Sequence, residues 1–161
     1  MDDGFEEFAA AYGARLRRTA FLLAGDWHTA ADLAQTTLTK MFLAWRRVGR
    51  DAGVYAYAQR VLINSYLATK RRRASSELTL GEMPDTPTPV DDTALRVALL
   101  GALGTLPPRV RAVLILRFWE DLPVAEVATL LGCAEGTVKS QTARGLDRLR
   151  VLLGDSLFET C

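Results

Sequence analysis

Residues 122–140 carry the pattern of two short helices joined by a tight turn, and this segment constrains the fold more than any other. Ala128, Gly132 and Val138 stand four and then six residues apart, and apolar residues fill the neighbouring positions. A small alanine lets two helices cross closely, glycine permits a sharp turn, and valine anchors the second helix onto the first. The segment therefore predicts a helix-turn-helix motif, whose second helix runs from about Gly136 to Leu149.

The second helix of this motif has an apolar side and a polar, cationic side. At helical spacing Val138, Leu146 and Leu149 face inward. The outer face and its margin carry hydrogen-bond donors and cations: Thr137, Lys139, Ser140, Gln141, Arg144 and Arg148. In a DNA major groove such a helix contacts base edges with its N-terminal residues and phosphates with the remainder. The alternative is an ordinary solvated face, and the sequence does not tell which side chain contacts a base and which a phosphate.

The rest of the chain also shows helical periodicity. Apolar residues recur at three- and four-residue steps in five further segments, at residues 5–25, 30–48, 54–73, 94–103 and 109–119. No run of β-branched residues alternates with polar ones between turn pairs, as a strand would require. We therefore predict an all-α fold of two small helical domains, residues 1–73 and residues 94–161.

The formal net charge of +1, from 20 basic and 19 acidic groups, is the sum of unlike segments. Residues 32–73 hold nine basic groups against only Asp32 and Asp51. Residues 74–93 hold five acids and three prolines, and no Lys or Arg. We therefore predict a cationic first domain and a flexible acidic linker over residues 74–93. Because this linker repels DNA, we expect the chain alone to bind DNA weakly.

Several classes of protein are disfavoured by what the sequence lacks. No apolar run approaches the roughly 20 residues of a membrane span, and the N-terminus is acidic where a signal peptide is basic, so we expect a cytoplasmic protein without membrane contact. Cys133, Cys161 and His28 are too scattered for a metal site, and neither a metal nor a cofactor is expected. A Walker-type phosphate loop, a Ser-His-Asp set and clustered carboxylates are missing, which argues against an enzyme.

Five short segments carry the resemblance of this chain to a known family. They are Ala31–Gln35, Ala44–Arg46, Tyr55–Asn64, Leu106–Leu114 and Gly136–Ser140. In chain order, the first two resemble region 2.2 of bacterial sigma factors of the extracytoplasmic-function (ECF) group, and the third resembles regions 2.3 and 2.4. The last two resemble the helix that precedes the recognition helix of region 4 and the start of that helix. Nearly the whole chain is covered, and it looks closest to the short actinobacterial sigma-E-like branch.

In this family the first domain, region 2, binds the clamp helices of the RNA polymerase β′ subunit. The resemblance implies that residues 1–73 bind core polymerase through the helix from Asp32 to Trp45, and that the β flap is a further contact. The implied contact residues are Asp32, Gln35, Thr36, Thr39 and Trp45. Thr36 departs from the acidic residue that the family often has there. The alternative is that Asp32 caps the start of the helix and Gln35 is an ordinary surface residue.

Region 2 of the family also contacts the −10 promoter element, where a base is turned out of the stack. The resemblance implies this role for Tyr57, Arg60, Asn64, Tyr66, Lys70 and Arg71. Extruding a base costs a few kcal/mol, which planar rings and an amide can offset, and the basic residues suit phosphates. Tyr57 stands where the family often has Trp. The alternatives are that Tyr57 is a core aromatic and that the basic run only complements the helix dipole.

Region 4, residues 94–161, is implied to read the −35 element with its helix-turn-helix. The expected function is that of a sigma factor, which binds core polymerase, directs promoter-specific initiation and helps to open the duplex. An anti-sigma factor is a further candidate partner, and the free chain is expected to be a monomer. The rival hypothesis is a stand-alone helix-turn-helix repressor or response-regulator output module, which would bind duplex DNA tightly without polymerase.

Overall fold

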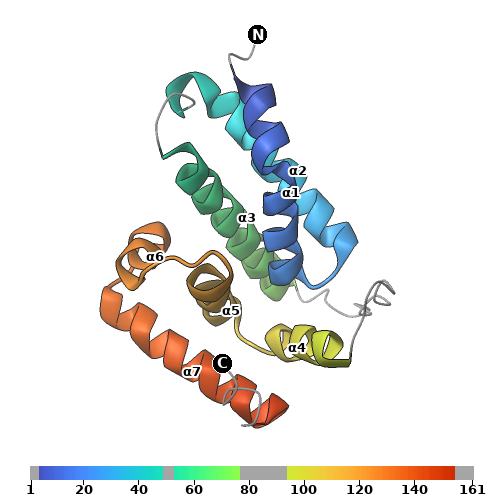
Figure 1. Cartoon of the computed structure of the whole chain (residues 1–161), viewed down its shortest axis with the longest axis vertical. Coiled ribbons are helices and arrows are strands. Elements are labelled where there is room, and N and C mark those ends of the chain that lie inside the picture. Colours follow the sequence, from blue (N-terminus) through green and yellow to red (C-terminus); the bar gives the residue numbers. More distant parts are fainter. Residues whose placement is uncertain (1–3, 49–52, 77–93, 155–161) are drawn as a thin grey trace. The chain divides into compact units, whose positions relative to one another are not determined.

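The computed structural model describes residues 4–48, 53–76 and 94–154, and over these ranges the chain is helical without a strand (Figure 1). The elements are α1 (Phe5–Ala24), α2 (Trp27–Val48), α3 (Val54–Ser76), α4 (Ala94–Gly104), α5 (Pro108–Leu114), a π-helix η1 (Ile115–Trp119), α6 (Val124–Leu131) and α7 (Glu135–Leu153). The predicted all-α fold is confirmed. The chain divides into two compact units, Met1–Glu82 and Met83–Cys161.

The acidic linker predicted over residues 74–93 lies largely outside the described residues, which stop at residue 76 and resume at residue 94. Its first three residues continue α3, which ends at Ser76 and not at Arg73. None of the described helices is long and apolar enough to cross a membrane.

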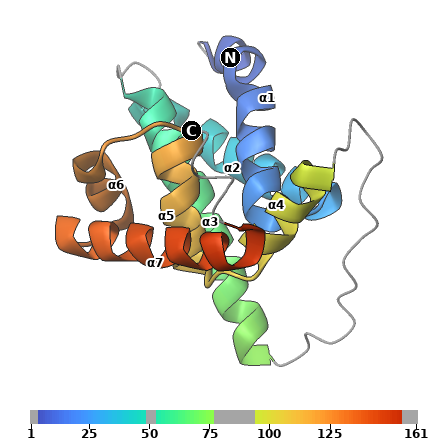
Figure 2. The same cartoon turned by 60° about the horizontal axis from the view of Figure 1, so that its bottom comes forward.

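The first unit is built of α1, α2 and α3, which lie side by side (Figure 1, Figure 2). All three helices contribute to its core. The largest side chains with no solvent exposure include Leu16 and Leu23 of α1, Met41 of α2, and Leu62 and Ile63 of α3. Each of the three helices packs against the two others.

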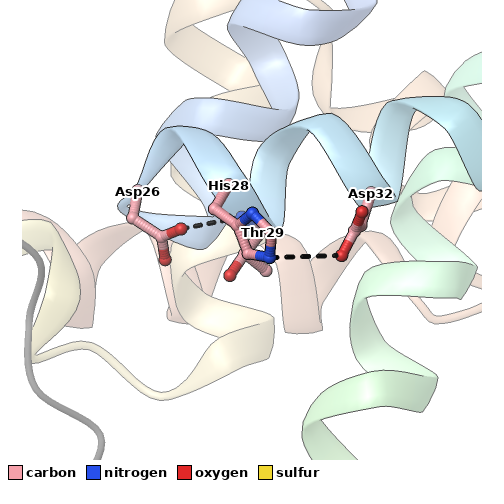
Figure 3. Close-up of polar contacts among 4 residues, drawn as sticks. All are labelled: Asp26, His28, Thr29 and Asp32. Carbon is pink, nitrogen blue, oxygen red and sulfur yellow. Dashed lines mark hydrogen bonds and ion pairs between the residues drawn. The ribbon is translucent and has the colours of Figure 1, made fainter.

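A side-chain cap sets the start of α2, three residues before the predicted start at residue 30. Gly25 ends α1 in the left-handed conformation at φ 91°, which glycine adopts without strain. Asp26 follows, and its Oδ1 accepts a hydrogen bond from the backbone N–H of Thr29 at 2.7 Å (Figure 3). This is the bond that a capping aspartate makes to the third residue of a helix. Asp26 therefore caps α2, and Asp32 lies more than a turn inside the helix.

The second unit forms around the crossing of α5 and α7. Its core cluster contains Ala102, Leu103, Leu106, Val110, Leu114 and Leu149, with Leu146 and Leu153 packed against it. Gly145 is buried where α7 meets α5, and a Cβ there would lie 2.7 Å from Cδ1 of Leu114. The absence of a side chain at Gly145 therefore lets the two helices approach closely.

The helix predicted over residues 109–119 changes character halfway. It begins as α5 and continues as the π-helix η1, where the backbone N–H of Glu120 donates to the carbonyl of Ile115 at 3.0 Å. A π-turn contains an extra residue, so it rotates the following side chains relative to an α-helix. Ile115 and Leu116 stay buried, whereas Phe118 and Trp119 are exposed.

The predicted helix-turn-helix is present as α6, a tight turn and α7. Gly132 has φ 69°, and its backbone N–H donates to the carbonyl oxygens at the end of α6. Val127 and Val138 are fully buried and Ala128 is 6% exposed, as the spacing of these apolar residues predicts. The second helix is longer than expected, because α7 continues to Leu153.

Candidate nucleic-acid and polymerase interfaces

The outer face of α7 presents four of the six side chains that the sequence singled out. Lys139, Ser140, Arg144 and Arg148 are exposed. The hydroxyl of Ser140 donates to the carbonyl of Thr137 at 3.2 Å, which leaves the Ser140 oxygen free to accept. This face therefore offers three cations and one hydroxyl to a partner.

The other two candidates on α7, Thr137 and Gln141, are half-buried at the margin of this face. The Oε1 atom of Gln141 is fully covered and has no hydrogen-bond partner among the described residues. The sequence pattern alone missed Ala143, which is exposed one residue before Arg144. Its signal was the spacing, since Ala143 follows Lys139 by four residues and Ser140 by three.

A groove lies beside the two arginines at the end of this face. Arg144, Asp147 and Arg148 line it from α7, and the start of α5 lines the opposite side. Asp147 is engaged within its own helix, because its Oδ1 lies 3.2 Å from Nη1 of Arg150. The carboxylate of Asp147 is therefore paired with Arg150, and the groove keeps a cationic rim.

On α3 the predicted DNA contacts fall into two groups. Arg60, Asn64 and Arg71 are exposed, at spacings of four and seven residues, so they form one ridge along the helix. Tyr57 and Lys70 are half-buried beside it.

Tyr66 belongs to the core of the first unit. Its side chain is 3% exposed, and Nζ of Lys70 lies 5.9 Å from the centroid of its ring. Tyr66 follows Leu62 by four and Ile63 by three residues, which puts it on the side of α3 that faces the other helices. The contact of Tyr66 with DNA stays a prediction, which this packing does not favour.

The outer face of α2 carries the predicted polymerase contacts with one exception. Asp32, Gln35, Thr36 and Thr39 are exposed. The Asp32 side chain is 77% exposed, and its Oδ2 lies 4.0 Å from Nε2 of His28 (Figure 3). Because the start of α2 is capped by Asp26, the alternative role of Asp32 as a cap is removed.

Trp45 is the exception on α2. It is 8% exposed and packs among the rings of α1, with its centroid 5.5 Å from that of Phe5 and 5.4 Å from that of Phe8. The contact of Trp45 with polymerase stays a prediction, which this packing does not favour. Two large apolar residues of α2 are exposed instead, Phe42 at 54% and Leu43 at 77%. Leu43 follows Thr39 by four residues and Thr36 by seven, so it belongs to the same exposed face of α2. The sequence analysis did not include Leu43 in that face.

Comparison with known proteins connects the two units to one family. The model of sigma-70 region 2 matches residues 8–76, and the model of sigma-70 region 4 matches residues 96–149. The chain is 36% identical to the RNA polymerase sigma-E factor of Streptomyces coelicolor over 150 residues, which cover 91% of this chain and 84% of that protein. This chain belongs to the sigma-70 family.

The same comparisons place this sigma factor in the ECF group. It is 31% identical to the ECF RNA polymerase sigma factor SigM of Mycobacterium tuberculosis, over 93% of this chain and 77% of that one. Among solved structures, it is similar to the sigma factor RpoE of Bartonella quintana, crystallised with the anti-sigma factor NepR. The TM-score is 0.78 and the identity 25%, over 94% of this chain and 97% of that chain.

The chain is thus an RNA polymerase sigma factor and not an enzyme. Its region 2 match spans α1 to α3, and its region 4 match spans the helix-turn-helix. Within the described ranges, no group of three or more His, Cys, Asp or Glu side chains is placed to hold a metal ion.

Proposed function

We propose that this sigma factor reads the −35 element with α7 and the −10 element with α3, and that it opens the duplex once α2 has bound core polymerase. The observation that carries the proposal is the outer face of α7, where Lys139, Ser140, Arg144 and Arg148 are exposed directly after a helix-turn-helix turn. Such a helix fits a major groove, and its first residues reach the base edges.

On this proposal Lys139 and Ser140 contact bases, because they lie in the first two turns of α7. Arg144 and Arg148 lie further along the helix and border the groove beside α5, which suits phosphates or a final base. Thr137 and Gln141 contribute from the margin, with only part of each side chain accessible. Ala143 offers a methyl group to the DNA major groove, where small apolar side chains contact the methyl group of thymine.

For the −10 element we propose that Arg60, Lys70 and Arg71 contact phosphates while Tyr57 and Asn64 contact bases. The exposed ridge of Arg60, Asn64 and Arg71 supports this arrangement, with Tyr57 beside its first member. A ring and an amide at this edge suit an unstacked base, whose capture must offset the few kcal/mol of its extrusion.

For the polymerase we propose that Asp32, Gln35, Thr36, Thr39 and Leu43 contact the β′ clamp helices, and that region 4 contacts the β flap. Their common exposure on α2 supports the first contact. The complex of the Bartonella quintana sigma factor with NepR supports an anti-sigma partner for this chain as well. The proposed free form is a monomer, and it acts in the cytoplasm, where polymerase meets the chromosome.

The test is promoter-specific transcription by core polymerase to which the purified chain is added, with the 5′ ends of all transcripts sequenced. Asp32→Lys should weaken core binding by about tenfold, because it reverses a charge in the proposed contact. Glu7→Lys is the matched control, since it reverses an exposed charge of α1 outside that face. Tight binding of the chain alone to duplex DNA, together with no core binding and no initiation, would favour the stand-alone repressor.

A further inference from the structure

The first turn of α3 is held against α1 by stacked side chains. The ring of Tyr55 stacks on that of Tyr12 with centroids 4.6 Å apart and planes at 24°. The guanidinium carbon of Arg15 lies 4.4 Å from the centroid of the same Tyr55 ring. Tyr12 and Arg15 are neighbours along α1, so together they fix the start of α3 against that helix.

Tyr57 follows Tyr55 by two residues and points to another side of α3, because successive residues of an α-helix turn by about 100°. The stack on Tyr55 therefore fixes the backbone beneath Tyr57 but not the direction of its ring. That direction has a separate contact from α2. Nη2 of Arg47, in the last turn of α2, donates to the hydroxyl oxygen of Tyr57 at 3.5 Å.

This contact depends on the chemistry of both side chains. A guanidinium group only donates hydrogen bonds, so its partner must accept. The phenol oxygen of Tyr57 accepts, whereas the indole of a tryptophan only donates. A tryptophan at this position could not accept the bond from Arg47. The tyrosine and the arginine of this chain therefore form a matched pair.

We propose that Arg47 is a positioning residue for Tyr57, which it holds by the hydroxyl so that the ring is oriented before promoter DNA arrives. The inference rests on the proposed role of Tyr57 at the −10 element. A long, exposed hydrogen bond adds little to the stability of the fold. Its value lies in restricting the ring, since immobilising a free side chain on binding weakens association by about two- to tenfold.

A double-mutant cycle tests the inference with the full chain bound to core polymerase. The measurement is the rate of open-complex formation on a duplex promoter at which this chain starts transcription. Arg47→Ala and Tyr57→Phe should each slow opening by about two- to tenfold. The double variant should be no slower than Arg47→Ala alone, because each substitution breaks the same contact. Core binding, measured separately, should be equal for all four proteins.

Arg46→Ala is the matched control, because it removes an exposed arginine one residue away, whose side chain leaves α2 in a direction about 100° from that of Arg47. Any effect it has should be the same with or without Tyr57→Phe. The inference is overturned if the effects of Arg47→Ala and Tyr57→Phe multiply, or if Arg47→Ala leaves the rate unchanged. Tyr57→Ala separates this failure from a broader one. Normal opening by Tyr57→Ala would reject the proposed role of Tyr57 itself.

Discussion

The two helices proposed to read DNA, α3 and α7, differ in how much of their surface the fold leaves open. On α7 one stripe is buried, which includes Val138, Gly145 and Leu149, and four of six predicted contacts are exposed. On α3, neighbours on two sides bury seven residues between Ala58 and Leu67, and three of six predicted contacts are exposed.

This difference shows that the width of the buried stripe limits what a helix can present to DNA, since α7 packs against α4, α5 and α6 and still keeps the broader open face. A helix supported along one stripe keeps a broad outer face, so polar residues at helical spacing reach solvent. A helix with a wider buried stripe keeps a narrow ridge, and an aromatic residue beside that ridge becomes part of the core. On α3 the positions of Asn64 and Tyr66 are only two residues apart, yet one is exposed and the other is buried.

The largest effect that tests this contrast is expected at those two positions. Tyr66→Ala should lower the free energy of unfolding by about 3–5 kcal/mol, because it removes a large ring from a packed core. Asn64→Ala should change it by less than about 0.5 kcal/mol, since Asn64 is exposed, while slowing promoter opening. Urea denaturation followed by circular dichroism measures the free energy of unfolding of both variants. Equal stabilities of the two variants would show that Tyr66 is not a core residue.

The sequence predicted those parts of the fold that depend on a periodic pattern of apolar residues. It did not predict those that depend on a single local hydrogen bond. The helix-turn-helix was predictable because Ala128, Gly132 and Val138 stand within a complete frame of apolar residues, which the fold buries around the turn at Gly132. The start of α2 was not, because Asp26 caps it through one hydrogen bond that leaves no periodic signal. The π-helix was missed for a related reason. Its extra residue rotates the side chains that follow, so that Phe118 is exposed, and the apolar spacing of the sequence does not reveal this rotation.

The differences between expected and observed exposure at the candidate sites have the same physical origin. Trp45 and Tyr66 were assigned to partners from family resemblance, and both are core residues. Phe42 belongs to the apolar pattern of residues 30–48 and is nevertheless exposed, although its ring centroid lies 5.3 Å from that of Phe5. One helix can bury only part of its circumference against its neighbours, and the sequence of that helix alone does not tell which apolar residues fall within that part.

On α7 the contrast predicts a large loss of DNA binding from a residue that does not stabilise the fold. Arg144→Ala should weaken −35 binding by the polymerase complex by about 1–3 kcal/mol if Arg144 contacts a base. If it contacts a phosphate, the loss should be uniform over sequences and the slope of log K against log salt should fall by about 1. Arg150→Ala is the control, because Arg150 lies on the same helix and is paired with Asp147. Equal losses from both variants would mean that only the total charge of α7 matters.

The smallest expected effect is at Gln141, which is half-buried at the margin of the α7 face, as Tyr57 and Lys70 are on α3. Its Oε1 is covered and lacks a partner among the described residues, and a covered acceptor without a hydrogen bond destabilises the folded state. Gln141→Met keeps the length and the helix propensity of the side chain and removes this acceptor, so the free energy of unfolding should rise by up to about 1 kcal/mol. Ser140→Ala, at an exposed neighbour, should leave stability within about 0.5 kcal/mol. The loss of −35 affinity from Gln141→Met should be smaller than that from Arg144→Ala, because Gln141 is half-buried whereas Arg144 is exposed. A fall in the free energy of unfolding with Gln141→Met would show instead that the amide of Gln141 makes a hydrogen bond in solution. Gln141 would then be more open to solvent than its packing indicates.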